Sequence, residues 1–171
     1  MERLYHISEE SGIKVFHPRP SPSFYDAIKG DVVFAISDKM LHNYLLPRNC
    51  PRVTYYTSPA TSKEDKDKFF GSSKAGFIIN VEEEWIEKIK NTVIYKYEFS
   101  PDNFILLDEI AGYYVSYEKE IAIDTVPVTN ISGELISRNA ELRCFPSLMN
   151  LAEEVKNSTL NFSMIRMKNC K

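Results

Sequence analysis

The segment Val93 to Phe99 carries the clearest secondary-structure signal in the chain, because apolar and polar side chains alternate along it. Tyr95, Tyr97 and Phe99 would share one face of a strand, since successive side chains of a strand point to opposite faces. Runs of β-branched and aromatic residues predict further strands, and the helices predicted between them are short and few. Without regular strand–helix alternation, this pattern favours an α+β fold with a mixed sheet over a doubly wound parallel sheet. The other strands are expected at 3–8, 32–36, 53–57, 77–81, 103–107, 112–117 and 121–124, around Leu142 and Cys144, and at 162–167.

Capping residues and apolar spacing place the helices. Leu148, Leu151, Ala152 and Val155 recur at i, i+3, i+4 and i+7, which is typical of one buried helix face. Residues 61–75 alternate acidic and basic side chains before a Gly-Ser-Ser sequence, so we expect a mobile surface loop there. Three further helices are expected, opened by Ser37 or Asp38, by a capping box of Asn80 and Glu83, and by Ser132.

Size and composition limit the class of protein. A chain of 171 residues with 43% hydrophobic residues is expected to form a single domain, residues 1–171, around an ordinary core. The net charge is −3 and the basic residues are scattered, which argues against a nucleic-acid partner. No leader is seen before the first strand and no apolar run approaches the ~20 residues that span a bilayer, so no membrane association is expected. Three widely spaced cysteines are typical of reduced thiols, and we expect a cytoplasmic protein.

Several kinds of chemistry have no matching motif. The His and Cys residues lack the spacing of metal ligands, so no metal site is expected. The six glycines never form a dinucleotide-binding or phosphate-loop motif, which excludes a Rossmann unit and P-loop phosphoryl transfer. Cys50 lies between Arg48 and Arg52, where positive charge would favour a reactive thiolate, although a packed thiol is the simpler alternative.

Polar side chains beside rigid segments form the candidate binding site. His6 and Ser8 lie two residues apart on a strand, so both can face ribose hydroxyl groups. The alternative is a core histidine whose hydrogen bonds go to the backbone. Arg19, Arg48 and Arg52 each follow a proline, which stiffens the loop that presents the guanidinium fork to phosphate or carboxylate oxygens. The alternative is that each arginine is solvated or paired with an acidic side chain.

The order of these parts resembles the ADP-ribosyltransferase-like fold of NAD-using toxins and RNA 2′-phosphotransferases. That family opens with a strand ending in His-Ser or His-Thr, which His6-Ile7-Ser8 matches with one residue inserted. Val33 to Ser37 followed by Tyr44 is similar to the family's second strand and its aromatic residue that stacks on nicotinamide. Over nearly the whole chain, the segments Leu4 to Arg52 and Ala111 to Ser116 resemble a small bacterial family known only as a domain of unknown function.

This resemblance implies a split, mixed β-sheet with a few short helices and a cleft for a small anionic, nucleotide-like ligand. NAD or an ADP-ribose-type group would be the ligand or substrate. The family's catalytic glutamate falls where this chain has Tyr113 or Tyr114, with Glu109, Glu118 and Glu120 on either side. Two functions therefore stay open: a binding module without catalysis, or a transferase or hydrolase acting on NAD or an ADP-ribosyl or phosphate group. The sequence identifies no catalytic residue and no protein partner, and the expected ligand-binding residues are His6, Ser8, Arg19, Tyr44, Arg48 and Tyr113.

Overall fold

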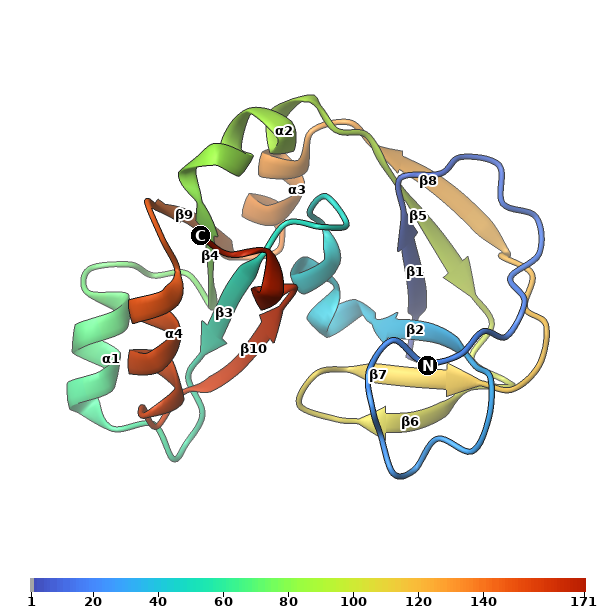
Figure 1. Ribbon diagram of the computed structural model, residues 1–171, viewed down its shortest axis with the longest axis horizontal. Coiled ribbons are helices and arrows are strands. Elements are labelled where there is room, and N and C mark those ends of the chain that lie inside the picture. The colour runs from blue at the N-terminus through green and yellow to red at the C-terminus, as the bar shows by residue number, and fades with distance from the viewer. Residues whose placement is uncertain (1) are drawn as a thin grey trace. The chain divides into compact units, whose positions relative to one another are not determined.

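The computed structural model describes residues 2–171, which divide into two compact units. Unit 1 comprises the chain up to Leu41 together with Val93–Thr129, and unit 2 comprises His42–Thr92 together with Asn130–Lys171. Each unit contains its own β-sheet, and short helices accompany them (Figure 1). The predicted α+β class is therefore confirmed, whereas the expectation of one domain over residues 1–171 stays a prediction.

Unit 1 is built on a six-stranded sheet in which every neighbouring pair is antiparallel. The strand expected at 121–124 lies later in the chain, at Asp124–Val128, and Ile123 just before it donates a backbone hydrogen bond to the carbonyl of Glu98. The sheet order is β6-β7-β2-β1-β5-β8, with β1 Leu4–Ser8, β2 Val33–Ser37, β5 Ile94–Phe99, β6 Ile105–Asp108, β7 Tyr113–Ser116 and β8 Asp124–Val128.

One face of this sheet carries the core of unit 1, and we call it the His6 face. Strand alternation and the pairing registers place on it His6, Leu4 and Ser8 of β1, with Val33, Ala35, Tyr97, Phe99, Tyr114 and Ser116 of the neighbouring strands. The loop at residues 16–22, which contains three prolines, covers part of this face through Phe16, whose ring centroid lies 5.1 Å from that of Tyr97 and 5.0 Å from that of Phe99. The loop predicted from its prolines thus also completes the core.

A short helix follows β2 where one was predicted, and it is the 3₁₀ helix η1 (Asp38–Tyr44). Its start packs closely on Gly112, which precedes β7. Gly112 has a φ of +70°, and a Cβ atom there would lie 2.5 Å from Oγ of Ser37 and 2.7 Å from Cβ of Met40. Only glycine tolerates both the left-handed backbone and this close approach. The turn before β7 is therefore fixed against the end of β2.

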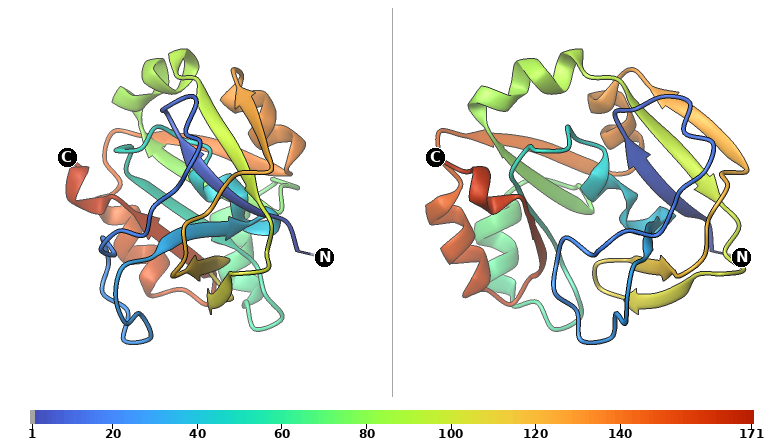
Figure 2. Two further views of the ribbon diagram at one scale, coloured as in Figure 1. Left: turned by 90° about the vertical axis from the view of Figure 1, so that its right-hand side faces the viewer. Right: turned by 45° about the vertical axis from the view of Figure 1, so that its right-hand side comes forward.

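Unit 2 contains a four-stranded mixed sheet of order β10-β3-β4-β9, in which β4 and β9 are parallel. Helices α1 and α4 lie side by side on the same side of this sheet (Figures 1 and 2) and enclose an apolar core. Across residues 2–171, no helix combines the length and apolarity that crossing a bilayer requires. The elements are β3 Arg52–Tyr56, β4 Phe77–Glu82, β9 Ala140–Phe145, β10 Asn161–Ile165, α1 Lys63–Phe70, η2 Glu83–Trp85, α2 Ile86–Asn91, α3 Ile131–Ser137, α4 Met149–Lys156 and η3 Met167–Asn169.

The expected mobile loop at 61–75 is wrong, because residues 63–70 form helix α1. Ser62 caps its first turn by accepting a hydrogen bond from the amide of Asp65, and Gly71 ends it with a φ of +56°. Phe69 and Phe70 are buried against the sheet core. The alternating charges that suggested a loop lie on the exposed side of a helix whose last turn is anchored by two aromatic rings.

Two predicted helix starts also need correction. Asn80 lies within β4 and donates its side-chain amide to the carbonyl of Val53, 2.9 Å away, so it forms no capping box with Glu83. The cap of α3 is Asn130, which accepts a hydrogen bond from the amide of Gly133, and Ser132 lies inside the helix. Asn side chains serve as caps and as partners for strand backbone alike, so sequence alone does not separate these roles.

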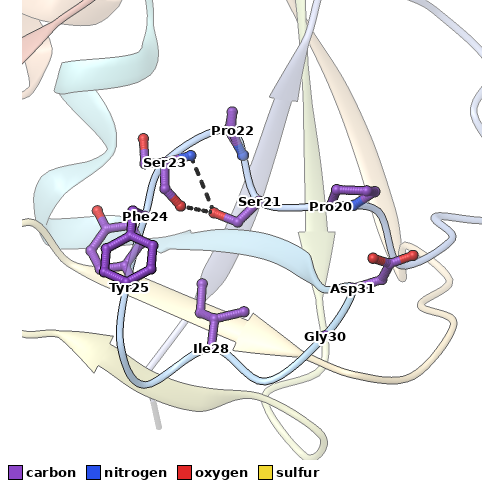
Figure 3. A pocket seen from close by; sticks show the side chains of 9 residues that line it. All are labelled: Pro20, Ser21, Pro22, Ser23, Phe24, Tyr25, Ile28, Gly30 and Asp31. Carbon is purple, nitrogen blue, oxygen red and sulfur yellow. Dashed lines mark hydrogen bonds between the residues drawn. The ribbon is translucent and has the colours of Figure 1, made fainter.

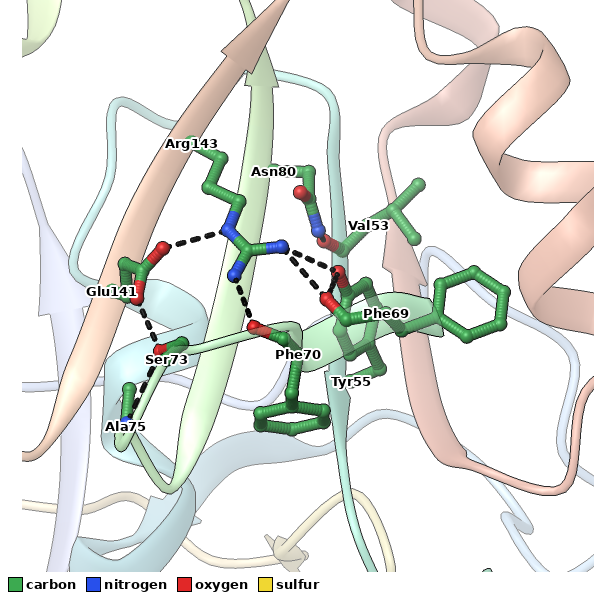
Figure 4. Close-up of polar contacts among 9 residues, drawn as sticks. All are labelled: Val53, Tyr55, Phe69, Phe70, Ser73, Ala75, Asn80, Glu141 and Arg143. Atoms are coloured by element: carbon green, nitrogen blue, oxygen red, sulfur yellow. Dashed lines mark hydrogen bonds and ion pairs between the residues drawn. The ribbon is translucent and has the colours of Figure 1, made fainter. Parts of the chain in front are cut away.

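Arg143 joins α1 to the four-stranded sheet (Figure 4). Its guanidinium donates to the carbonyl of Phe69 at 2.7 Å and to that of Phe70 at 3.3 Å. These are carbonyls of the last turn of α1, which have no partner within the helix. Glu141, two residues earlier on β9, accepts from Nε of Arg143 at 2.7 Å and from the hydroxyl of Ser73. The polar network explains why this short helix is held in place.

Candidate functional site

His6 lies in β1 where this strand separates from β2. β1 pairs with β5 from Leu4 to Ser8, whereas its register with β2 covers only Leu4 and Tyr5 (Figure 1). Nδ1 of His6 is 3.1 Å from the carbonyl oxygen of Phe34, and the imidazole packs on the ring of Phe16 at 4.9 Å. A carbonyl only accepts, so we assign a proton to Nδ1. The half-buried imidazole is thus fixed in orientation where the two strands part.

Ser8 lies two residues further along the same face and is also half-buried. Its Oγ accepts a hydrogen bond from the amide of Glu10 at 3.0 Å, which leaves the hydroxyl hydrogen to donate elsewhere. Tyr97, directly across from His6 on β5, donates to the carbonyl of Glu10 at 2.7 Å and accepts from the amide of Ile13 at 3.2 Å. These bonds fix the course of the chain over the His6 face.

Glu120 is a buried carboxylate associated with the same face. It is 6% exposed, and Ser116 of β7 donates its hydroxyl to the carboxylate. Glu120 and Phe16 also exchange two backbone hydrogen bonds, of 2.8 and 2.9 Å. Residues paired in this way direct their side chains to the same side, so the carboxylate and the Phe16 ring that touches His6 both point to the sheet. Glu109 and Glu118, by contrast, are exposed.

The two tyrosines of β7 divide between the faces of the sheet. Tyr114 pairs with Ala35 and shares the His6 face, whereas Tyr113 pairs with Ile36 on the opposite face. The ring of Tyr113 makes edge contacts with Tyr25 and Phe34, each at 6.3 Å, and burial raises the pKa of its hydroxyl. The structure therefore brings His6 and Ser8 together and places Tyr113 behind the sheet from them.

Arg19 lies at the edge of a loop in unit 1. Its backbone forms two hydrogen bonds with Val32, and its exposed guanidinium has no hydrogen-bond or ion-pair partner within residues 2–171. The loop that begins there contains a pocket of about 410 Å³ (Figure 3), whose only charged lining residue is Asp31. The Ser21 hydroxyl in its wall is already engaged, because it donates to the backbone carbonyl of Ser23 and accepts from the amide of Ser23. A pocket with one negative charge does not suit an anionic ligand.

The remaining predicted site residues belong to unit 2. Tyr44, at the end of η1, is half-buried, and Arg48 is exposed in the following loop. Cys50 is fully buried, and desolvation raises the pKa of its thiol to about 12 in spite of the neighbouring charge of Arg52. The thiol is neutral at physiological pH, which disfavours the alternative of a reactive thiolate.

Metal-ligating side chains do not gather in the described part of the chain: residues 2–171 contain no cluster of three or more His, Cys, Asp or Glu side chains that could hold an ion. The arrangement on the His6 face is instead one of hydrogen-bonding groups, namely an oriented imidazole, a serine hydroxyl and a buried carboxylate held by a second serine. Such groups can bind sugar hydroxyls, because a hydroxyl both donates and accepts: the imidazole and the carboxylate are acceptors, and the Ser8 hydroxyl is a donor.

Residues 5–170 match the model of a family of unknown function (DUF6886), so the chain belongs to that family. No curated protein matches the chain. No solved structure matches it either.

Proposed function

We propose that this member of the family binds a small anionic nucleotide, NAD or an ADP-ribose-type ligand, on the His6 face of unit 1. The observation that carries the proposal is the position of His6 at the point where β1 and β2 separate, with its ring oriented by the Phe34 carbonyl. An imidazole protonated at Nδ1 presents Nε2 as an acceptor in its neutral form. Ser8, on the same face, adds a donor. Together they suit the vicinal hydroxyls of a ribose.

The phosphates of the ligand would be held by guanidinium groups. Arg19 belongs to the same unit as His6, and its exposed side chain is uncommitted within residues 2–171. A planar guanidinium binds phosphate oxygens in pairs, which a lysine does not reproduce. Arg48 and the stacking residue Tyr44 stay predictions from the sequence, whereas Tyr113 lies on the opposite face of the sheet and is left out of the proposed site. We include in the proposal, as its finer statement, a relationship to the ADP-ribosyltransferase-like fold, which rests on the sequence resemblance of His6-Ile7-Ser8 and of Val33 to Ser37.

A second candidate is catalysis, and the buried carboxylate of Glu120 favours it. In the resembling transferases a glutamate binds the ribose 2′-hydroxyl and stabilises the positive charge that develops on the sugar. In such a step the C1′–N bond of NAD breaks, nicotinamide leaves with the bonding electron pair, and water adds to C1′ and loses a proton. Glu120, fixed by Ser116 on the His6 face, is the glutamate of this region with the appropriate burial.

Calorimetric titration of NAD and of ADP-ribose into the protein, with nicotinamide release measured in the same samples, tests both candidates. We expect saturable binding. Binding without release supports the binding module, and binding with release that is lost in Glu120→Gln supports the enzyme. Glu118→Gln is the matched control, because Glu118 is a nearby but exposed glutamate. Absence of binding for both ligands contradicts the proposal.

A further inference from the structure

Arg52 in unit 2 is a buried cation with no counter-ion in the part of the chain that the structure describes. The residue is 2% exposed, and its Nε and Nη1 atoms have no hydrogen-bond partner within residues 2–171. Glu82, the buried glutamate of unit 2, accepts its hydrogen bonds from the amides of Leu148 and Lys171. Strand alternation places Glu82 on the opposite face of the sheet, because its neighbour Val81 pairs with Arg52.

The surroundings of Arg52 carry further unused donors. Thr54 shares its face of β3, is 1% exposed, and has a hydroxyl without a partner in the described chain. Ile165 of β10 pairs with Arg52, and the next residue is Arg166, which has a left-handed backbone with a φ of +56°. Desolvation lowers the pKa of Arg52 to about 10, and the charge of Arg166 lowers it as well, although Cys50 acts in the opposite direction. The two arginines are thus close enough to repel each other.

A buried guanidinium with unpaired nitrogens is unfavourable, because its hydration is lost without compensation. A second positive charge nearby increases this cost. An oxyanion held between the two arginines removes both penalties. Arg52 begins β3 and Arg166 directly follows β10, so two guanidiniums and the Thr54 hydroxyl supply donors from two segments of the chain, which suits the three acceptor oxygens of a phosphoryl group.

We propose that Arg52, Arg166 and Thr54 form an oxyanion site in unit 2 that binds a phosphoryl group. The site shares no residue with the ligand site on the His6 face, so each proposal can fail without the other. The phosphoryl group has two possible sources, inorganic phosphate and the terminal phosphate of a nucleotide such as ADP.

Titration of inorganic phosphate and of ADP by calorimetry, at constant ionic strength in chloride, tests the site. We expect the wild-type protein to bind phosphate and Arg52→Met to bind it at least about tenfold more weakly, the effect of losing a charge-assisted hydrogen bond. Arg166→Gln should weaken binding as well. Arg138→Gln is the matched control, because Arg138 already pairs with Glu134 in the same unit. If Arg52→Met loses binding of both ADP and inorganic phosphate, the site takes the phosphate of a nucleotide. If Arg52→Met loses binding of inorganic phosphate alone, the site takes the free anion.

Thermal unfolding separates the proposed role from a structural one. Without phosphate, Arg52→Met should unfold at the same temperature as the wild type or higher, because it removes an uncompensated buried charge. With phosphate, the unfolding temperature of the wild type should rise more than that of Arg52→Met. Comparing the two proteins corrects for the general stabilising effect of this salt. The proposal would be overturned if the wild type did not bind phosphate, or if the wild type, Arg52→Met and Arg166→Gln bound it equally. It would also be overturned if Arg52→Met were destabilised while Arg166→Gln bound phosphate as the wild type does.

Discussion

Nδ1 of His6 lies 3.1 Å from the carbonyl oxygen of Phe34, on the strand from which β1 is separating. In a continuous antiparallel ladder, strand amides would satisfy such a carbonyl. Here an imidazole from the neighbouring strand bonds to it, and the ring is held further by Phe16. The hydrogen bond to Phe34 and the contact with Phe16 fix the orientation of the His6 ring, as binding a ligand hydroxyl requires.

Replacement of His6 by alanine should weaken NAD binding by about 1–3 kcal/mol, the cost of leaving a ligand hydroxyl without its partner. Calorimetry measures the affinity, and thermal unfolding measures the accompanying change in stability. The control is Phe16→Leu, which disturbs the packing around the imidazole but leaves its nitrogens in place. Unchanged affinity in a destabilised His6→Ala protein would identify His6 as a core residue only.

Glu120→Gln should reduce any nicotinamide release by the wild-type protein by about 10²–10³-fold, because it removes the charge that would stabilise the transition state. NAD binding should persist, since glutamine still accepts the hydrogen bond from Ser116. Release is measured by chromatography under saturating NAD. Glu109→Gln and Glu118→Gln should behave as the wild type, and a large effect in either of these exposed positions would show that a different glutamate acts.

The predicted phosphate contacts should depend on the shape of the cation as well as its charge. Arg19→Lys and Arg48→Lys should each lower NAD affinity, because lysine keeps the charge but loses the paired donors. Wild-type affinity should also fall with added salt, which screens exposed charges beyond ~8 Å at physiological ionic strength. Arg138→Lys, whose arginine is engaged by Glu134, serves as control. Equal affinities for lysine and arginine would contradict a guanidinium clamp.

The first turn of α1 should make stability pH-dependent. Hydrogen bonds from the hydroxyl of Thr159, at 2.6 Å, and from its amide, at 2.7 Å, lower the pKa of Asp65 below its ordinary value of 3.8. A depressed carboxyl pKa stabilises the fold above the ordinary value, and this contribution is lost as the pH falls through the lower, folded-state pKa. Urea unfolding should show Asp65→Asn to be less stable than the wild type at neutral pH, with the gap closing in acid.

Asp67→Asn is the matched control for that series, because Asp67 is exposed on the same helix. It should follow the wild-type pH dependence. A stability gap between wild type and Asp65→Asn that stays constant from neutral pH down to strong acid would rule out the proposed contribution of the Thr159 contacts.

Much of the secondary structure follows from local patterns in the sequence. Alternation predicted β5, and apolar runs predicted β1, β2 and β4, because these strands bury side chains in a regular order. The charge pattern predicts a loop where helix α1 forms, although Ser62 caps the helix and Gly71 ends it, since only the packing of Phe69 and Phe70 distinguishes that helix from a charged loop. Pairings over long distances in the sequence, such as Phe16 with Glu120, leave no local signal.

The candidate site shows the same limit. The spacing of His6 and Ser8 correctly predicts that they share a strand face. The face taken by Tyr113 depends on its register with β2, and the sequence fixes only that Tyr113 and Tyr114 point in opposite directions. The burial of Arg52 and Glu120 was likewise not predictable, because charged residues are rarely buried and their partners come from distant segments.

Calorimetric titration of NAD and ADP-ribose into the wild-type protein and into His6→Ala, both shown to be folded, tests directly whether the His6 face binds a nucleotide. We expect saturable binding of at least one ligand by the wild type and a clearly weaker affinity for His6→Ala. No binding by the wild type at ligand concentrations up to about 1 mM, which corresponds to about −4.1 kcal/mol, would contradict it. Equal affinity in the two proteins would contradict it as well.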